Sequence, residues 1–210
     1  MEEYFALAPV ASVIFAITVI TSLIAFYNED IYSRFMLHPY SVSRGKRVYT
    51  LITSGLIHND WMHLIFNMLS YYFFAGVLEK NLGHWQFGVL YVLSLVLSDL
   101  PSVNKHKEDY GYHSLGASGA VSAVIFGSIL FAPLTPIYIM LIPIPIYGVL
   151  FAVLYLVYCH YASKHARDNV NHDAHMFGAL SGLAITIILH HEVLPLFIHT
   201  ITEKVQSLLH

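Results

Sequence analysis

Long apolar stretches separated by short polar breaks are the main pattern of this 210-residue chain. A hydrocarbon layer about 30 Å thick requires roughly 20 apolar residues per helix, and several of the stretches approach this length. The pattern predicts an all-α, polytopic membrane protein with six transmembrane helices in one bundle. The predicted helices, numbered one to six, are Phe5–Tyr27, Trp61–Leu78, Trp85–Leu97, Leu115–Phe131, Ile137–Tyr158 and Ala174–Leu189.

The connecting segments show no sign of a second domain or an internal repeat. The longest, Asn28–Asp60, is half apolar, which is compatible with a place in the membrane interface. The tail Ile198–His210 has apolar residues at helical spacing, which indicates an interfacial amphipathic helix. We therefore expect one membrane domain over residues 1–210, with its core at about 5–190 and the tail at 191–210.

Composition supports a membrane protein and excludes several other classes. Apolar residues make up 57% of the chain and charged residues only 11%, more apolar surface than a water-soluble domain of this size could bury. The formal net charge of -3, with no basic stripe, argues against a nucleic-acid partner. Cys159 is the only cysteine, so no intramolecular disulfide or Cys-rich metal site is possible.

The N-terminal end and the loop charges bear on orientation. The first apolar run follows Met-Glu-Glu and lacks a convincing cleavage site, so we expect a retained first helix. If the N-terminus is cytoplasmic, the inner loops carry only Lys80 and Lys204, and the other eight Lys and Arg lie outside. That distribution opposes the positive-inside rule.

Polar side chains interrupt the apolar helices at three places. These are His63 with Asn67, Ser118 in a Gly-Ala-Ser-Gly sequence, and His175. Each lies near the N-terminal end of an even-numbered helix, and these helices cross the membrane in the same direction. The three places therefore share one depth, whatever the absolute orientation.

Two stripes of small residues predict which helices approach most closely. They are Gly119, Ala123 and Gly127 in helix four, and Ala174, Gly178 and Gly182 in helix six. Small residues four apart permit close backbone approach in membranes. Ser118 precedes the first stripe and His175 follows the first residue of the second, so their side chains could meet between the two helices.

A serine beside a neutral imidazole is a nucleophile with its general base, as acyl transfer requires. His63 and Asn67 lie on one helical face and could donate hydrogen bonds to a developing oxyanion, together with the Ser118 backbone N–H. Asp173 lies only two residues from His175 and should face elsewhere. The sequence predicts a Ser–His dyad without a carboxylate.

Structural roles are the alternative for each of these residues. Small residues in membrane helices usually serve packing, so Gly-Ala-Ser-Gly alone is weak evidence. His63 and His175 differ from most histidines here because each sits just inside an apolar run, where an ionisable group is costly. We assign interfacial or solvated positions to His58, His84, His106, His113, His160 and His190. For Glu79 we expect a structural role, such as capping a helix end.

The chain resembles the rhomboid family of intramembrane serine proteases. The resemblance rests on four segments in the family's order, His58–Asn67, Gly76–Gly83, Gly116–Gly119 and Ala174–Gly178. It implies a six-helix rhomboid-like core with Ser118 as nucleophile, His175 as base, and His63 and Asn67 as oxyanion donors.

The same resemblance implies that the N-terminus is inside and that the active site opens outward, in the inner (cell) membrane of a bacterium. It implies hydrolysis of peptide bonds in or near the transmembrane segments of membrane-protein substrates. Lipid and these substrates are the expected partners. No cofactor, metal or nucleic acid is expected.

Two positions depart from the family pattern. The first loop has Tyr49-Thr50 where many members carry Trp-Arg, and Ser122 stands where an aromatic residue often follows the nucleophile by four positions. The Ser122 hydroxyl is expected to bond a backbone carbonyl in the preceding turn rather than His175.

Three other functions compete with proteolysis. An inactive relative would bind membrane clients without cleaving them. An intramembrane metal site could use His58, His63, His172 and His175, although the His-Glu-x-x-His helix motif is missing. A transporter would line a path with the polar residues, but their clustering at one side favours a cavity.

Helix five is the expected lateral gate, the helix that moves to admit a transmembrane substrate. It carries Pro143, Pro145 and bulky residues such as Tyr147 and Phe151 instead of a small-residue stripe. We therefore expect loose packing, with Ala162–Asn171 as the cap of the gate.

Overall fold

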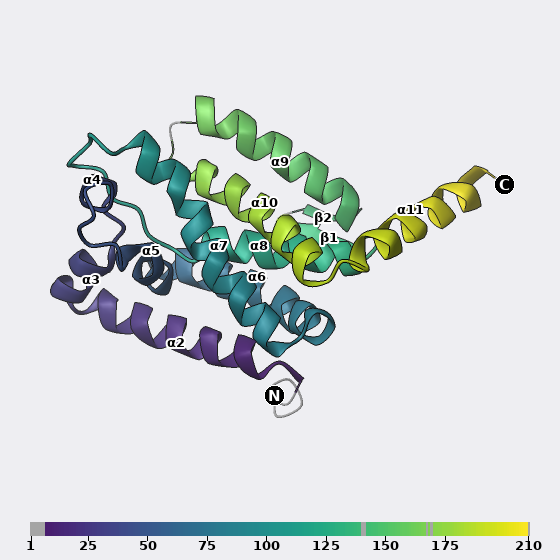
Figure 1. Ribbon diagram of the computed structural model, residues 1–210, viewed down its shortest axis with the longest axis horizontal. Coiled ribbons are helices and arrows are strands. Elements are labelled where there is room, and N and C mark those ends of the chain that lie inside the picture. Colours follow the sequence, from purple (N-terminus) through teal and green to yellow (C-terminus); the bar gives the residue numbers. More distant parts are fainter. Residues whose placement is uncertain (1–6, 140–141, 167, 169, 210) are drawn as a thin grey trace.

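The computed structural model describes residues 7–139, 142–166, 168 and 170–209. Within these residues the helices are α2 (Pro9–Phe26), α3 (Glu29–Phe35), α4 (Pro39–Val42), α5 (Thr50–Thr53), the 3-10 helix η1 (Ser54–Leu56), α6 (Trp61–Leu82), α7 (His84–Lys105), α8 (Ser118–Phe131), α9 (Gly148–His165), α10 (His172–Leu189) and α11 (Val193–Leu209). Strands β1 (Pro136–Ile139) and β2 (Ile142–Tyr147) form an antiparallel hairpin. Figure 1 shows α6, α7, α8 and α10 at the centre, with α2 along one side and α9 along the other.

The helical, polytopic membrane fold predicted from the sequence is confirmed. Among the described residues, α2, α6, α7 and α10 are long and apolar enough to cross a membrane, and α8 is apolar but shorter. Helix α8 begins at Ser118 instead of the predicted Leu115. The reason is Gly116, whose φ of 120° lies outside the helical region and is readily adopted only by glycine.

The predicted start of helix five is wrong. The segment around Pro143 and Pro145 forms strand β2, and α9 begins only at Gly148. Proline lacks an N–H donor and disfavours the helical conformation of the residue before it, so an Ile-Pro-Ile-Pro sequence favours extended backbone. Helix α9 then continues to His165, beyond the predicted end. In the expected gate cap, residues 167 and 169 lie outside the described residues.

The C-terminal tail is helical over Val193–Leu209, and its start precedes the predicted Ile198. Figure 1 shows α11 leaving the bundle, and of its described residues only Val193 is buried. Exposed apolar side chains of α11 include Ile198, Val205 and Leu208. Its place in a membrane interface stays a prediction.

Helices α8 and α10 meet at the small residues that the stripes predict. A Cβ added at Gly178 would overlap the backbone of Gly119, and one at Gly182 would overlap the backbone of Ala123. We call this contact the α8–α10 seam, defined by Gly119, Ala123, Gly178 and Gly182. Only glycine at positions 178 and 182 permits this backbone approach.

Glu79 has the structural role that its sequence position suggested. This fully buried carboxylate in α6 accepts hydrogen bonds from the backbone N–H groups of Val10 (3.0 Å) and Ala11 (2.6 Å) at the start of α2. The ring of His84 contacts the same carboxylate, with an Nδ1 to Oε1 distance of 2.6 Å. An anionic side chain at a helix N-terminus satisfies donors that have no partner within the helix.

Candidate active site

The backbone N–H groups of the segment before Ser118 donate two hydrogen bonds, one to a carbonyl and one to a histidine side chain. Gly116 N–H donates to the carbonyl of Ser54 (2.9 Å), and Ala117 N–H donates to Nε2 of His58 (3.4 Å). Ser118 is half-buried and is the first residue of α8. Its position therefore depends on residues from the loop before α6 as well as on its own helix.

His63 lies against this segment. A Cβ at Gly116 would lie only 2.6 Å from Cε1 and 2.7 Å from Nε2 of His63, so glycine leaves room for the imidazole. Asp60 caps α6 by accepting the backbone N–H of His63 (2.8 Å). That hydrogen bond, followed by one from the Asn59 side chain, holds the pKa of Asp60 below its ordinary value.

Asn67 lies one turn further along α6 and is buried. Its amide nitrogen donates to the carbonyl of His63 (2.9 Å). A side-chain amide has two N–H groups, so this bond leaves one donor for another acceptor. Both residues that the sequence nominates as oxyanion donors thus lie on α6, with His63 directly beside the Ser118 segment.

His175 lies at the α8–α10 seam. A Cβ added at Gly119 would be 3.4 Å from the carbonyl oxygen of Ala174. Gly119, the residue after Ser118, therefore lies close to Ala174, the residue before His175. The imidazole is half-buried. Among the described residues, however, no hydrogen bond joins the Ser118 hydroxyl to a ring nitrogen of His175.

Two aromatic rings approach His175. Tyr155 of α9 is nearly parallel to it, at a centroid distance of 6.5 Å and an interplanar angle of 13°. His172 is nearly perpendicular, at 6.1 Å and 80°. The aromatic neighbour therefore comes from α9, a contact that the sequence did not predict because it joins distant segments.

The expectation for Ser122 is wrong. Its hydroxyl forms a hydrogen bond with the hydroxyl of Tyr155 (2.9 Å) instead of with a carbonyl in the preceding turn. Ser122 is buried, and Tyr155 offers a partner from a neighbouring helix at the height of the seam. Such a tertiary partner cannot be read from local spacing.

His58 is not interfacial or solvated, as the sequence suggested, but fully buried. Its Nε2 accepts the Ala117 N–H, so the proton lies on Nδ1 and is donated to the hydroxyl of Ser22 (2.9 Å). Burial, and to a smaller extent the nearby His63, lowers the pKa of His58 to about 3. The neutral ring packs against His63 at 4.9 Å and 77°.

No carboxylate contacts His175 among the described residues. Asp173 faces away, as expected, and pairs with Lys105 (2.8 Å). Asp168 instead approaches Nε2 of His172 (3.1 Å), and the backbone N–H of Val170 is the main cause that holds the pKa of Asp168 below its ordinary value. No group of three His, Cys, Asp or Glu residues converges to hold a metal ion in the described part of the chain.

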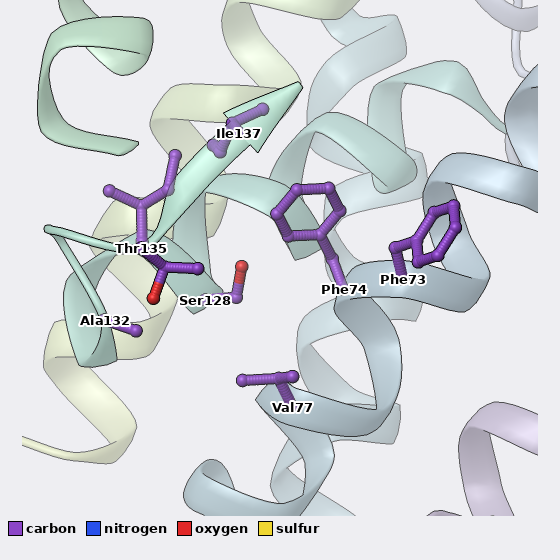
Figure 2. A pocket seen from close by; sticks show the side chains of 8 residues that line it. Phe73, Phe74, Val77, Ser128, Ala132, Thr135 and Ile137 are labelled. Atoms are coloured by element: carbon purple, nitrogen blue, oxygen red, sulfur yellow. The ribbon is translucent and has the colours of Figure 1, made fainter. Parts of the chain in front are cut away.

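Two hollows lie beside the helices, away from Ser118. A cavity of about 120 Å³ lies between α6, the end of α8 and β1, as Figure 2 shows. Its lining is Phe73, Phe74, Val77, Ser128, Ile129, Ala132, Thr135 and Ile137. Because Ser118 and His63 occupy the opposite ends of α8 and α6, this cavity is separate from the candidate site. A groove of about 610 Å³ runs between α9 and α10.

Comparison with known proteins agrees with this architecture. Residues 45–192 match the family described as the Rhomboid domain. A candidate rhomboid protease of Bacillus subtilis, YdcA, is 29% identical over 145 residues, which are 66% of this chain and 65% of that protein. The mitochondrial RHOMBOID-like protein 12 of Arabidopsis thaliana is 25% identical over 166 residues, 70% of this chain and 49% of that protein.

The rhomboid protease GlpG of Photorhabdus laumondii is 31% identical over 83 residues, which are 40% of this chain and 28% of that protein. The chain thus spans less than two thirds of the length of each of these relatives. The family match covers the helices that carry Ser118, His175, His63 and Asn67. The protein is therefore a multi-pass integral membrane protein, and it belongs to the rhomboid family.

Proposed function

We propose that this protein is a serine endopeptidase that cleaves peptide bonds in or near the transmembrane segments of membrane proteins. Ser118 is the nucleophile and His175 the general base. The α8–α10 seam is the observation that supports this best, because it puts the residues adjoining Ser118 and His175 in contact. Catalytic hydrogen bonds are often long in the absence of substrate and tighten when it binds.

The reaction follows from the chemistry of these groups. The Ser118 hydroxyl attacks the scissile carbonyl while a ring nitrogen of His175 takes its proton. The resulting imidazolium then gives the proton to the leaving amine, which produces an acyl-enzyme and the first product. A water molecule, deprotonated by His175, then attacks the ester, and the imidazolium returns this proton to the Ser118 oxygen as the acyl–oxygen bond breaks and the carboxylic acid product leaves.

The oxyanion of each tetrahedral intermediate needs hydrogen-bond donors. Nδ1 of His63 accepts the Asn59 N–H (3.4 Å), which leaves the His63 proton on Nε2, the atom that lies against Gly116. The second amide N–H of Asn67 and the backbone N–H of Ser118 complete the proposed set. Donors that are held in place before the reaction need little reorganisation as charge develops.

Cleavage of a transmembrane substrate by purified protein in liposomes tests the proposal. We expect Ser118→Ala and His175→Ala to abolish both cleavage and labelling of the protein by a fluorophosphonate. Ser128→Ala is the matched control, because this serine lies in the same helix and donates to the carbonyl of Ile125 (2.8 Å), far from the site. Undiminished cleavage by Ser118→Ala would end the serine-protease proposal.

A further inference from the structure

Tyr155 combines two contacts that the proposed mechanism does not use. Its ring lies parallel to His175, and its hydroxyl bonds Ser122, one turn after Ser118 in α8. We propose that Tyr155 is a positioning residue that orients the His175 imidazole, and that it makes this orientation depend on the place of α9. This inference rests on the proposed function and adds a residue and a mode of control to it.

The Tyr155 ring is itself held on other sides. Phe151, one turn earlier in α9, stacks on it at 5.5 Å and 27°. Phe126 of α8 packs against it at 5.6 Å and 49°. Aromatic pairs at these distances have preferred geometries, so the Tyr155 ring presents a fixed face to His175.

The hydrogen bond of the Tyr155 hydroxyl restricts movement of the ring further. Ser122 is only 4% exposed, so its hydrogen bond with Tyr155 (2.9 Å) is shielded from water. A buried hydroxyl that loses its partner costs free energy, which favours the arrangement with both hydroxyls paired. One end of the Tyr155 side chain is thereby tied to α8, the helix that carries Ser118.

The small side chain at position 122 makes this arrangement possible. Many family members carry an aromatic residue at this position of the helix, whereas here the ring beside His175 comes from Tyr155 of α9 and Ser122 bonds its hydroxyl. The support for His175 therefore comes from a different helix than the nucleophile. Displacement of α9 would remove the ring face and the hydroxyl anchor together.

Helix α9 is suited to such displacement. Of its described residues only Gly148, Cys159 and Ala162 are buried, whereas α8 is buried along most of its length. Few buried contacts mean a low cost of local movement. A substrate that displaces α9 would free His175, and return of α9 would reorient the base, so access and proton transfer are coupled.

The test compares four variants for cleavage of a transmembrane substrate in liposomes. Tyr155→Leu removes the ring and should lower kcat about 10- to 100-fold with little change in KM, because a misplaced base loses alignment after substrate has bound. Tyr155→Phe keeps the ring, and Ser122→Ala removes only the hydrogen bond of the Tyr155 hydroxyl, so each should lower kcat about tenfold or less, and clearly less than Tyr155→Leu does. Tyr161→Leu is the matched control with wild-type kcat, since Tyr161 is exposed and its ring stacks on His165.

Nuclear magnetic resonance of histidine-labelled protein in detergent detects the contact between the Tyr155 and His175 rings independently of cleavage. The His175 signals are identified by their loss in His175→Gln. A parallel ring shifts the resonances of its neighbour, so Tyr155→Leu should move the His175 signals and Tyr161→Leu should not. Thermal unfolding of each variant checks that it is folded.

The outcomes separate the two proposals. Wild-type kcat in Tyr155→Leu, or His175 signals that do not move, overturns the role of Tyr155 even where Ser118→Ala confirms the protease. Equal losses in Tyr155→Phe and Tyr155→Leu, or in Tyr161→Leu, also overturn it, because ring stacking would not be the cause. If Ser118→Ala still cleaves, the function fails, and the resonance shift alone decides whether Tyr155 positions His175.

Discussion

Burial and hydrogen-bond partners, not residue type, distinguish the histidines around the candidate site. His58 is buried with both ring nitrogens engaged, so it holds the backbone before Ser118 as a neutral structural ring. His63 lies against the same segment, and in the proposed mechanism its Nε2 donates to the substrate oxyanion. His175 is half-buried, with aromatic rings as neighbours. Similar side chains therefore serve support, electrophilic stabilisation and proton transfer in the proposed mechanism.

The oxyanion assignment predicts a specific kinetic loss. Asn67→Ala or His63→Ala should lower kcat on the order of 10²–10³-fold, the cost of one lost oxyanion donor. Cleavage rates at saturating substrate measure this, and thermal unfolding controls for the loss of the Asn67 bond to its own helix. Wild-type rates in both variants would remove these residues from the mechanism.

The buried His58 predicts a pH dependence of stability. Its pKa is lowered from 6.5 to about 3, so the folded protein favours the neutral ring. The stabilisation is fully present above pH 6.5 and is lost as the pH falls toward 3, because the unfolded chain takes up the proton first.

Thermal unfolding of wild type and His58→Gln between these pH values measures the effect. The variant should unfold at a lower temperature near pH 7, and the difference should shrink as the pH falls. Titrating groups far from His58 are common to both proteins and cancel in the comparison. A difference that stays constant or grows would contradict a neutral His58.

The sequence could nominate candidate site residues, which stay a prediction, because spacing along a helix is local. Positions 63 and 67 share a face of α6, and Ser118 and His175 adjoin small-residue stripes that the structure brings together. The roles of His58 and Tyr155 could not be predicted. Their partners, Ala117, Ser122 and His175, lie far away in the chain and are determined only by tertiary packing.

At the scale of elements, the same reasoning worked for small-residue stripes and failed at prolines. The stripes predicted the α8–α10 seam because close backbone approach requires small residues on both helices. Hydrophobicity alone placed helix five from Ile137, although the prolines at 143 and 145 favour extended backbone. An apolar run predicts that a segment is buried. Prolines inside the run indicate which part of that segment is extended instead of helical.

The seam predicts that one methyl group is enough to disturb the site. Gly178→Ala would force the added Cβ into the backbone of Gly119, and should destabilise the protein by about 1–3 kcal/mol or more. We expect cleavage to fall as well, because Ser118 and His175 adjoin this contact.

Gly88→Ala is the matched control. This glycine is also inside a helix, but its added Cβ would meet only Val10 Cγ1 at 3.5 Å, an ordinary contact. Since alanine has the higher helix propensity, this variant should be as stable as wild type or up to about 1 kcal/mol more stable. Equal thermal stability of the two variants would mean that α8 and α10 are not in close contact.

At the scale of the whole molecule, the loop charges and the family orientation disagree. Rhomboid resemblance puts the N-terminus inside, yet eight of ten Lys and Arg then lie in outer loops. The structure gives several of these cations local partners. Arg44 donates to Glu108 (2.8 Å) and to the Lys107 carbonyl (2.7 Å), and Arg47 donates to the carbonyls of Ser33 and Arg34.

The Arg44 contacts join the segment between α2 and α6 to the loop after α7, whereas the Arg47 contacts lie within that segment. Arg44 and Arg47 thereby hold the first loop shortly before Tyr49-Thr50, the pair that departs from the family pattern. Lys and Arg residues that stabilise the fold would be retained in outer loops although they oppose the positive-inside rule. We therefore expect the family orientation, with the site on the outer side.

Labelling with a membrane-impermeant maleimide in intact bacterial cells tests this orientation. Gly111 lies in the exposed loop between α7 and α8, and Asn81 lies at the end of α6 that is far from His63. Replacing either residue by cysteine leaves the number of charged residues unchanged. Gly111→Cys should label in intact cells, and Asn81→Cys only after permeabilisation. The unchanged protein is the control, because its only cysteine, Cys159, is buried. The reverse pattern would mean that the loop charges override the family orientation, and the proposed substrates would then be cut on the cytoplasmic side.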